Sequence, residues 1–174
     1  NGEVLAASIN RDAIGIVGRL DGVVRVVSGT APMIEILLDD LSMKKEEEGT
    51  TRALIKGVLA GIQERGGKIG GFQAYITSDV LIGAGLSSSA AFETLIGTIE
   101  SGLYNDMGLS PVDIAVIGQY AENVYFGKPC GLMDQTASSV GNLVHIDFAD
   151  RNHPKIERIA CDLEAYGYSL CITD

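Results

Sequence analysis

The sequence has few cysteines, and those few are not clustered. Its three cysteines, Cys130, Cys161 and Cys171, are odd in number and have no Cys-x-x-Cys spacing. Disulfide-stapled extracellular domains and structural zinc sites need paired or clustered cysteines. The sequence therefore indicates neither a disulfide framework nor a zinc site, and we expect a protein of the reducing cytoplasm.

Basic residues and long apolar runs are also scarce. Thirteen Lys and Arg stand against 23 Asp and Glu, which gives a formal net charge of −10. A surface with this charge repels phosphate backbones and anionic lipid headgroups. The longest stretch without a charge, residues 80–92, has 13 residues, whereas a membrane span needs about 18 apolar residues. We therefore expect no nucleic-acid partner and no membrane partner.

The sequence also lacks internal repeats, linkers and low-complexity tracts. Its 174 residues suit one domain, because domains usually hold roughly 100 to 200 residues. A composition of 46% hydrophobic and 21% charged residues provides enough apolar material for a core. The chain begins at Asn1 without Met and continues directly into a strand-like run, so we expect a fragment of a longer protein.

Hydrophobic patterns predict a mixture of strands and helices. The expected strands are residues 4–9, 13–19, 23–27, 33–38, 72–81, 142–148 and 168–173. Asp21-Gly22 suits a tight hairpin turn between the second and third of these. This order of hairpins and helices is typical of an α+β fold.

Apolar residues at helical spacing predict three helices. One runs from Thr51 to a glycine cap at Gly66, and another starts at Ser110-Pro111 with Asp113 as the acid of its first turn. The residues expected on the buried faces are Leu54, Ile55, Val58, Leu59 and Ile62 in the first helix, Ala91, Leu95, Ile99 and Leu103 in the second, and Ile114, Ile117, Ala121 and Val124 in the third.

A glycine- and serine-rich turn, Gly83-Ala84-Gly85-Leu86-Ser87-Ser88-Ser89, joins a predicted strand to a predicted helix. The N–H groups at a helix N-terminus attract anions, and glycines let a triphosphate approach the main chain closely. The serine hydroxyls can bind phosphate or a metal. A glycine turn capped by serine is the alternative, since short glycine motifs match often by chance; the triple serine favours phosphate.

The turn does not end in the Gly-Lys-Ser/Thr of a P-loop, so it supplies no lysine for the phosphates. Mg²⁺, which takes one or two protein oxygens, would neutralise their charge together with a nearby carboxylate. Glu122 borders the apolar stripe and is one candidate; an exposed acid on a helix face is its alternative reading. Asp134 follows a Gly-Pro loop and could take a proton from a substrate hydroxyl, or else act as a helix N-cap.

Two segments carry a resemblance to the galactokinase branch of the GHMP sugar and metabolite kinases. Residues 81–91, LIGAGLSSSAA, resemble the ATP-binding motif of that superfamily. Ala121-Glu122-Asn123 together with residues 127–135, GKPCGLMDQ, are similar to the galactokinase signature around the catalytic acid. Residues 1–10 resemble the stretch after the galactokinase sugar-binding motif, so the likeness covers nearly the whole chain.

The resemblance implies a fold, a reaction and a set of site residues. The fold is a mixed sheet with helices packed on one side, as in domain 2 of ribosomal protein S5. The reaction transfers the γ-phosphoryl group of ATP to the C1 hydroxyl of galactose. Residues 83–89 would wrap the ATP phosphates, Ser89 and Glu122 would hold Mg²⁺, Asp134 would be the catalytic base, and Gly131 would lie near the sugar.

The sequence also departs from the family pattern. The early sugar-binding motif would precede Asn1, and the third glycine-rich motif and second domain would follow Asp174. Residues 1–174 are thus expected to be an N-terminal domain, truncated at both ends and inactive alone. Lys128 stands where the family often has an apolar residue. Two alternatives stay open: another GHMP kinase acting on an N-acetylated hexosamine or L-arabinose, and a galactose- and ATP-binding sensor without turnover.

Three other residues receive structural interpretations. His145 is expected to be an ordinary strand residue, because no second His or Cys is placed to help it bind a metal. Cys130 is expected to be a small buried residue without a neighbouring base. Gly118 is expected to be merely tolerated within its helix, with the close approach of another helix or strand as the alternative.

Overall fold

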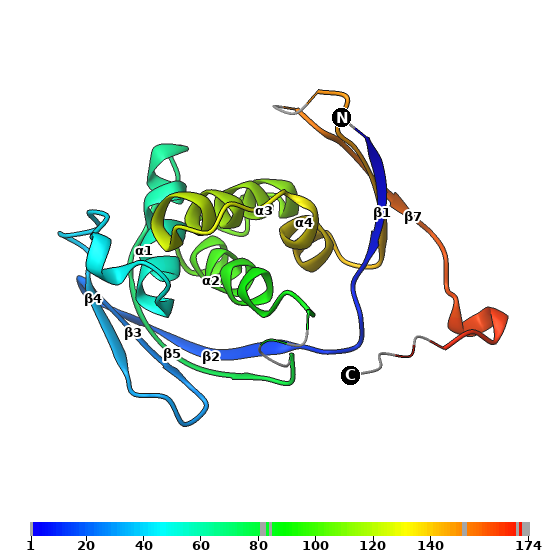
Figure 1. The fold of residues 1–174 in the computed structure, drawn as a ribbon. Helices are drawn as coiled ribbons and strands as arrows, with labels where there is room; N and C mark the ends of the chain where they lie inside the picture. The colour runs from blue at the N-terminus through cyan, green and yellow to red at the C-terminus, as the bar shows by residue number, and fades with distance from the viewer. Residues whose placement is uncertain (1, 81–82, 84, 151–152, 170, 172–174) are drawn as a thin grey trace.

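The computed structural model of the chain describes residues 2–80, 83, 85–150, 153–169 and 171. Its main layer is a curved four-stranded sheet of β2 (Ala13–Leu20), β5 (Gly71–Ser78), β3 (Val23–Ser28) and β4 (Ile34–Leu37), in that order. β3 runs parallel to β5 and the other neighbours are antiparallel. The helices lie on one side of this sheet (Figure 1). The expected α+β architecture, a mixed sheet with helices on one side, is confirmed.

The turn at Asp21-Gly22 forms, but the hairpin expected around it is wrong. β2 and β3 are not neighbours, because β5 lies between them. Gly71, the first residue of β5, sits in the fork where the two strands separate. A Cβ atom there would lie 2.5 Å from the carbonyl oxygen of Leu20 and 2.6 Å from that of Val23. The missing side chain therefore lets β5 enter between two strands that a local reading joins.

The helices are α1 (Thr51–Glu64), α2 (Ser88–Tyr104), α3 (Pro111–Tyr120) and α4 (Met133–Val140). Thr50 caps the start of α1, and Gly66, with φ +77°, follows its end. The expected buried face of α1 is confirmed and packs on the sheet against residues such as Phe72 and Ile76. Each such buried apolar side chain contributes about 1.5–3 kcal/mol. The layer of α1 and α2 against the sheet is therefore the core.

The start of α3 is also as expected. Ser110 accepts a hydrogen bond from the N–H of Asp113, and the Asp113 carboxylate accepts one from the N–H of Ser110 at 3.1 Å. This reciprocal pair satisfies two N–H groups that the helix itself leaves free. The sequence signal was sufficient here because both partners lie within one turn.

The buried faces of α2 and α3 differ in part from the expected ones. α3 continues into a π-helical turn, η2 (Ala121–Phe126), in which the N–H of Gly127 bonds to the carbonyl of Glu122. This wider turn buries Tyr125 and leaves Val124 42% exposed, so the prediction for Val124 is wrong. In α2, Ile99 is buried as expected, whereas Ala91, Leu95 and Leu103 are half-buried. Two glutamates of α2, Glu93 and Glu100, are fully buried instead.

A second, three-stranded antiparallel sheet was not anticipated. It has the order β1 (Glu3–Ala7), β6 (Leu143–Asp147) and β7 (Lys155–Ile159), and α4 contacts β1 and β6. β7 was missed because its charged, half-exposed sequence has no apolar run. The strand expected at residues 168–173 is wrong where the structure describes it, since residues 168, 169 and 171 lie in no strand. No helix of the described part is long and apolar enough to cross a membrane.

Candidate functional site

The glycine- and serine-rich turn leads into the first turn of α2. Gly83 and Gly85 have φ values of +81° and +71°, which residues with a side chain rarely adopt. A Cβ built on either meets no heavy atom within 4 Å, so the space beside both is free. Ala84, also assigned to phosphate binding by the resemblance, lies outside the described residues. Leu86, assigned in the same way, is described and lies between Gly85 and Ser87 in the turn.

The N-terminus of α2 is left uncapped by its own residues. Its N-cap, Ser87, makes no side-chain cap hydrogen bond and has φ +56° and ψ +48°. A left-handed conformation costs a residue other than glycine on the order of 1–2 kcal/mol. The first N–H groups of a helix, here those of Ser88 and Ser89, have no partner within the helix and face an anion favourably. The first N–H groups of α2 thus receive no hydrogen bond from the Ser87 side chain.

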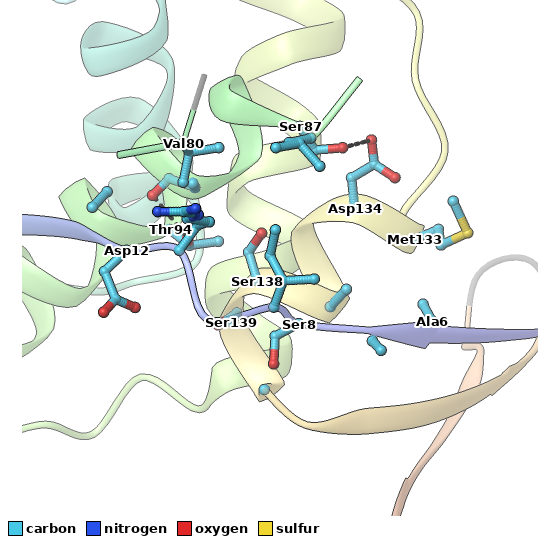
Figure 2. A pocket seen from close by; sticks show the side chains of 18 of the residues that line it. Ala6, Ser8, Asp12, Val80, Ser87, Thr94, Met133, Asp134, Ser138 and Ser139 are labelled. Carbon is cyan, nitrogen blue, oxygen red and sulfur yellow. Dashed lines mark hydrogen bonds between the residues drawn. The ribbon is translucent and has the colours of Figure 1, made fainter. Parts of the chain in front are cut away.

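The Ser87 side chain instead contacts the candidate base. Its hydroxyl donates a hydrogen bond to Oδ2 of Asp134 at 2.6 Å (Figure 2). Asp134 belongs to the first turn of α4, whose N-cap is Leu132, so the alternative of Asp134 as an N-cap is wrong. Two segments 47 residues apart therefore place a hydroxyl of the turn and a carboxylate in direct contact.

Asp134 lines a cavity of about 580 Å³. The walls come from β1, the segment that follows it, the turn before α2, and the inner faces of α2 and α4 (Figure 2). Leu86 and Gly85 also line it. Gly131, assigned to the sugar by the resemblance, is exposed and is not among the described residues of this wall. The candidate base thus faces a space large enough for a small molecule.

Glu122 lies at the start of η2 with only 3% of its surface exposed, so the alternative of an exposed helix-face acid is wrong. Its Oε1 accepts a hydrogen bond from the Ser89 hydroxyl at 3.0 Å and lies 3.3 Å from the Lys128 ammonium. Its Oε2 accepts a hydrogen bond from the Gln135 amide at 2.8 Å. The two residues expected to share a metal, Ser89 and Glu122, are therefore in contact.

Glu122 carries a negative charge at neutral pH. Burial alone would raise its pKa, but hydrogen bonds from Cys130, Ser89 and Lys128 outweigh burial and hold the pKa below its usual value. A buried carboxylate beside a hydroxyl supplies the one or two protein oxygens that Mg²⁺ takes together with phosphate and water oxygens. The described residues contain no cluster of three or more His, Cys, Asp or Glu that could hold a metal. A metal at this site would therefore depend on ligand oxygens as well.

Sequence reasoning missed a second buried acid at the site. Glu93 of α2 is fully buried, and Gln135 donates one hydrogen bond to it at 3.1 Å and another to Glu122. Burial raises the pKa of Glu93 to about 8, and the charge of Glu122 adds to the increase, so Glu93 is neutral at pH 7. Its position four residues after Ser89, on the same helix face, is the signal that could have found it.

Three smaller expectations are settled by the surroundings of the site. A Cβ on Gly118 would lie 3.1 Å from Cγ of Gln135 and 3.2 Å from Oε2 of Glu93, so this glycine makes room for the pair and is not merely tolerated. Cys130 is half-buried rather than buried, and it does have a neighbouring carboxylate, that of Glu122, to which its thiol donates a hydrogen bond; burial and this hydrogen bond raise the pKa of the thiol to about 12. His145 is an ordinary strand residue of β6 that contacts Glu3 at 3.0 Å.

Comparison with known proteins identifies the family of this fold. A family model described as the N-terminal domain of GHMP kinases matches residues 53–142, a segment that contains most of α1, all of β5, α2, α3, η2 and α4, and every candidate site residue. The chain belongs to the GHMP kinase family. The match includes both contacting pairs, Ser87 with Asp134 and Ser89 with Glu122.

Individual relatives of this GHMP kinase domain are galactokinases. The chain is 36% identical over 177 aligned positions to a galactokinase of Streptomyces coelicolor, with 100% of this chain and 45% of that protein covered. It is 46% identical over 110 positions to one of Clostridium perfringens, covering 63% and 28%. The crystal structure of Lactococcus lactis galactokinase complexed with galactose matches with a TM-score of 0.79 and 28% identity, covering 91% of this chain and 41% of that one. The chain thus spans less than half the length of these relatives.

Proposed function

We propose that this GHMP kinase domain is the ATP- and sugar-binding N-terminal domain, residues 1–174, of a cytoplasmic galactokinase. The full protein would transfer the γ-phosphoryl group of Mg-ATP to the C1 hydroxyl of galactose. The observation that carries the proposal is the convergence of two pairs on the start of α2: Ser87 with Asp134 and Ser89 with Glu122. The galactokinase relatives, one of them complexed with galactose, support the choice of sugar.

The first part of the proposal concerns the phosphates. Phosphoryl transfer depends mainly on positioning and on neutralising charge at the phosphoryl oxygens. The N–H groups at the start of α2 and the turn around Gly83 and Gly85 would hold the phosphate chain. Ser89 and Glu122 would hold Mg²⁺, which when bound neutralises the phosphate oxygens. Because Gln135 holds Oε2 of Glu122, Oε1 is the oxygen that would be available to hold the metal.

The second part concerns the acceptor hydroxyl. Ser87 fixes Oδ2 of Asp134, which leaves Oδ1 to accept the proton of the C1 hydroxyl. The sugar oxygen then forms its bond to the γ-phosphorus, the bond from that phosphorus to the β-γ bridging oxygen breaks, and ADP leaves with the electron pair. The 580 Å³ cavity beside Asp134 gives room for the acceptor. Because the early sugar-binding motif and the second domain would complete the active site of the proposed enzyme, residues 1–174 alone would be inactive.

The base is tested by Asp134→Asn in the full-length protein. Loss of a general base lowers kcat by about 10²- to 10⁴-fold, and we expect the Kd for ATP to change less than twofold. A coupled assay of ADP release gives kcat, and calorimetry gives the Kd. Asp39→Asn, at an exposed carboxylate after β4, is the matched control. Near-normal turnover in Asp134→Asn removes the proposed base.

The substrate is tested on the same protein. We expect ADP release to depend on galactose and to be at least tenfold slower with N-acetylgalactosamine or L-arabinose. Preference for either of these sugars would identify a different GHMP sugar kinase. Binding of both galactose and ATP without ADP release would instead identify a sensor.

A further inference from the structure

The candidate phosphate-binding turn, residues 83–89, contains no lysine. Lys128 places a cation beside Glu122, at the candidate metal site. It follows η2, and its ammonium lies 3.3 Å from Oε1 of Glu122. The lysine side chain is 66% exposed, whereas that of Glu122 is 4% exposed. The ammonium therefore reaches from the solvent side onto a buried carboxylate.

The contact involves the one carboxylate oxygen that a metal would take. Oε2 of Glu122 is held by the buried amide of Gln135 at 2.8 Å. Oε1 is shared by the Ser89 hydroxyl and the Lys128 ammonium. A divalent cation bound at Oε1 would be in direct repulsion with the ammonium, so the two cations compete for this oxygen.

The same lysine is suited to bind phosphate. Its side chain is flexible and mostly exposed, and an ammonium is a point charge that can move between neighbouring oxygens. The chain as a whole has a net charge of −10, so an incoming polyphosphate needs a local positive charge to bind. Arg11, which lines the adjoining cavity, is paired with Asp79 at 3.3 Å.

We propose that Lys128 is a phosphate-binding residue that exchanges with the metal. Without metal, its ammonium lies at Glu122 and supplies the positive charge that the terminal phosphate oxygens of a bound nucleotide need. Mg²⁺ held by Glu122 would displace the ammonium and supply that charge in its place. Lys128 thus gives the site affinity for a nucleoside diphosphate or triphosphate that does not depend on metal. The proposal rests on the proposed function of this site as a nucleotide site.

The test measures binding of ADP to the full-length protein without turnover. Calorimetry gives the Kd in EDTA and in saturating Mg²⁺, and the variants are Lys128→Met and Lys128→Arg. Lys68→Met, at an exposed lysine near the far end of α2, is the control. We expect Lys128→Met to weaken binding in EDTA about tenfold and to weaken it at most threefold in Mg²⁺. The arginine and control variants should stay within twofold in EDTA.

A second measurement separates the exchange from simple loss of charge. In Lys128→Met, the Mg²⁺ concentration that half-saturates the gain in ADP affinity should fall about threefold, because the competing ammonium is gone. An unchanged Kd in EDTA, or an unchanged or higher Mg²⁺ requirement, overturns the proposal while leaving the proposed function intact. If the unmodified protein binds no ADP with or without Mg²⁺, both proposals fail. Equal thermal unfolding midpoints show that the variants are folded.

Discussion

Helix α2 buries a glutamate in each half, and the two halves of the helix use this acid differently. Glu93 and Glu100 are both fully buried, and burial raises the pKa of each to about 8. Glu93 shares the Gln135 amide with Glu122, at the candidate site. Glu100 accepts a hydrogen bond from the backbone N–H of Gly70 at 3.2 Å, at the entry to β5.

The difference shows that an unusual pKa does not by itself mark a site. Among the described residues no charged partner contributes to the pKa of Glu100; burial is the main cause of its rise and the Gly70 N–H opposes it. The charges of Glu122, Lys128 and Asp134 all act on Glu93. We therefore assign Glu93 to the site and Glu100 to the structure of the turn that starts β5.

The largest expected loss of stability comes from a side chain at Gly70, next to Glu100. A Cβ on Gly70 would lie 2.1 Å from the Tyr104 ring, and Tyr104 donates a hydrogen bond to the carbonyl of Gly71. We expect Gly70→Ala to lower the free energy of unfolding by about 3 kcal/mol, as overpacking does. Urea denaturation measures this loss. The Kd for ADP of the folded variant should not change, and a change would place this end of α2 in the site.

The matching change at the other end is Gln135→Leu. It removes the only amide that serves both Glu93 and Glu122 in the described structure, so a buried carboxylate loses its donor. We expect a loss of about 2 kcal/mol in the free energy of unfolding and, unlike Gly70→Ala, a several-fold weaker Kd for ADP in Mg²⁺. The same urea and calorimetry measurements apply. A variant that loses stability but keeps its Mg²⁺-dependent affinity would contradict the positioning of Glu122 by Gln135.

The smallest change replaces each acid by its amide, Glu100→Gln and Glu93→Gln. A carboxyl whose pKa is raised on folding is protonated in the native state but ionised in the unfolded state between pH 4.5 and about 8. The contribution of each of these two groups to stability is therefore fully present below pH 4.5 and is lost as pH rises toward 8, with a slope of at most about 1.4 kcal/mol per pH unit for each group. Each variant should lose the part of this slope that its own carboxyl contributes.

The two amide variants also sharpen the comparison. Urea denaturation at pH 5, 6, 7 and 8 gives the slope for each. Glu93→Gln should in addition alter the Mg²⁺ dependence of ADP binding, whereas Glu100→Gln should leave it as it was. Identical binding by the two would remove the distinction between the halves of α2.

Local signals were sufficient for the parts of the fold that depend on one turn of chain. The Ser110–Asp113 cap and the apolar face of α1 needed no distant partner. The predicted pairing of β2 with β3 was wrong because the native pairing depends on Gly71, about 50 residues further along. The predicted burial of Val124 was wrong because a π turn changes the helical phase.

The candidate site divides in the same way. The turn containing Gly83 and Gly85 and the candidate acids Glu122 and Asp134 could be named from the sequence pattern. The family resemblance then assigned the metal to Ser89 and Glu122 and the base to Asp134. That Ser87 reaches Asp134, that Glu122 is buried, and that Gln135 joins it to Glu93 depend on the packing of α2, α3 and α4. Glu93 itself was missed because an acid within an apolar helix pattern is ordinarily placed on the surface.

The insertion of β5 between β2 and β3 has a consequence for how the protein is made. During synthesis β2 and β3 emerge long before β5. The short turn between them favours a direct pairing of β2 with β3 that the native sheet does not contain. A nascent chain that ends near Gly70 can pair β3 with β4, but it lacks the native partner of β2 and of the other edge of β3. Pairing of these edges must wait until α1 and β5 have been made. Folding rates fall as contacts become more distant in sequence, so this sheet should form late and benefit from chaperones that shield its edges.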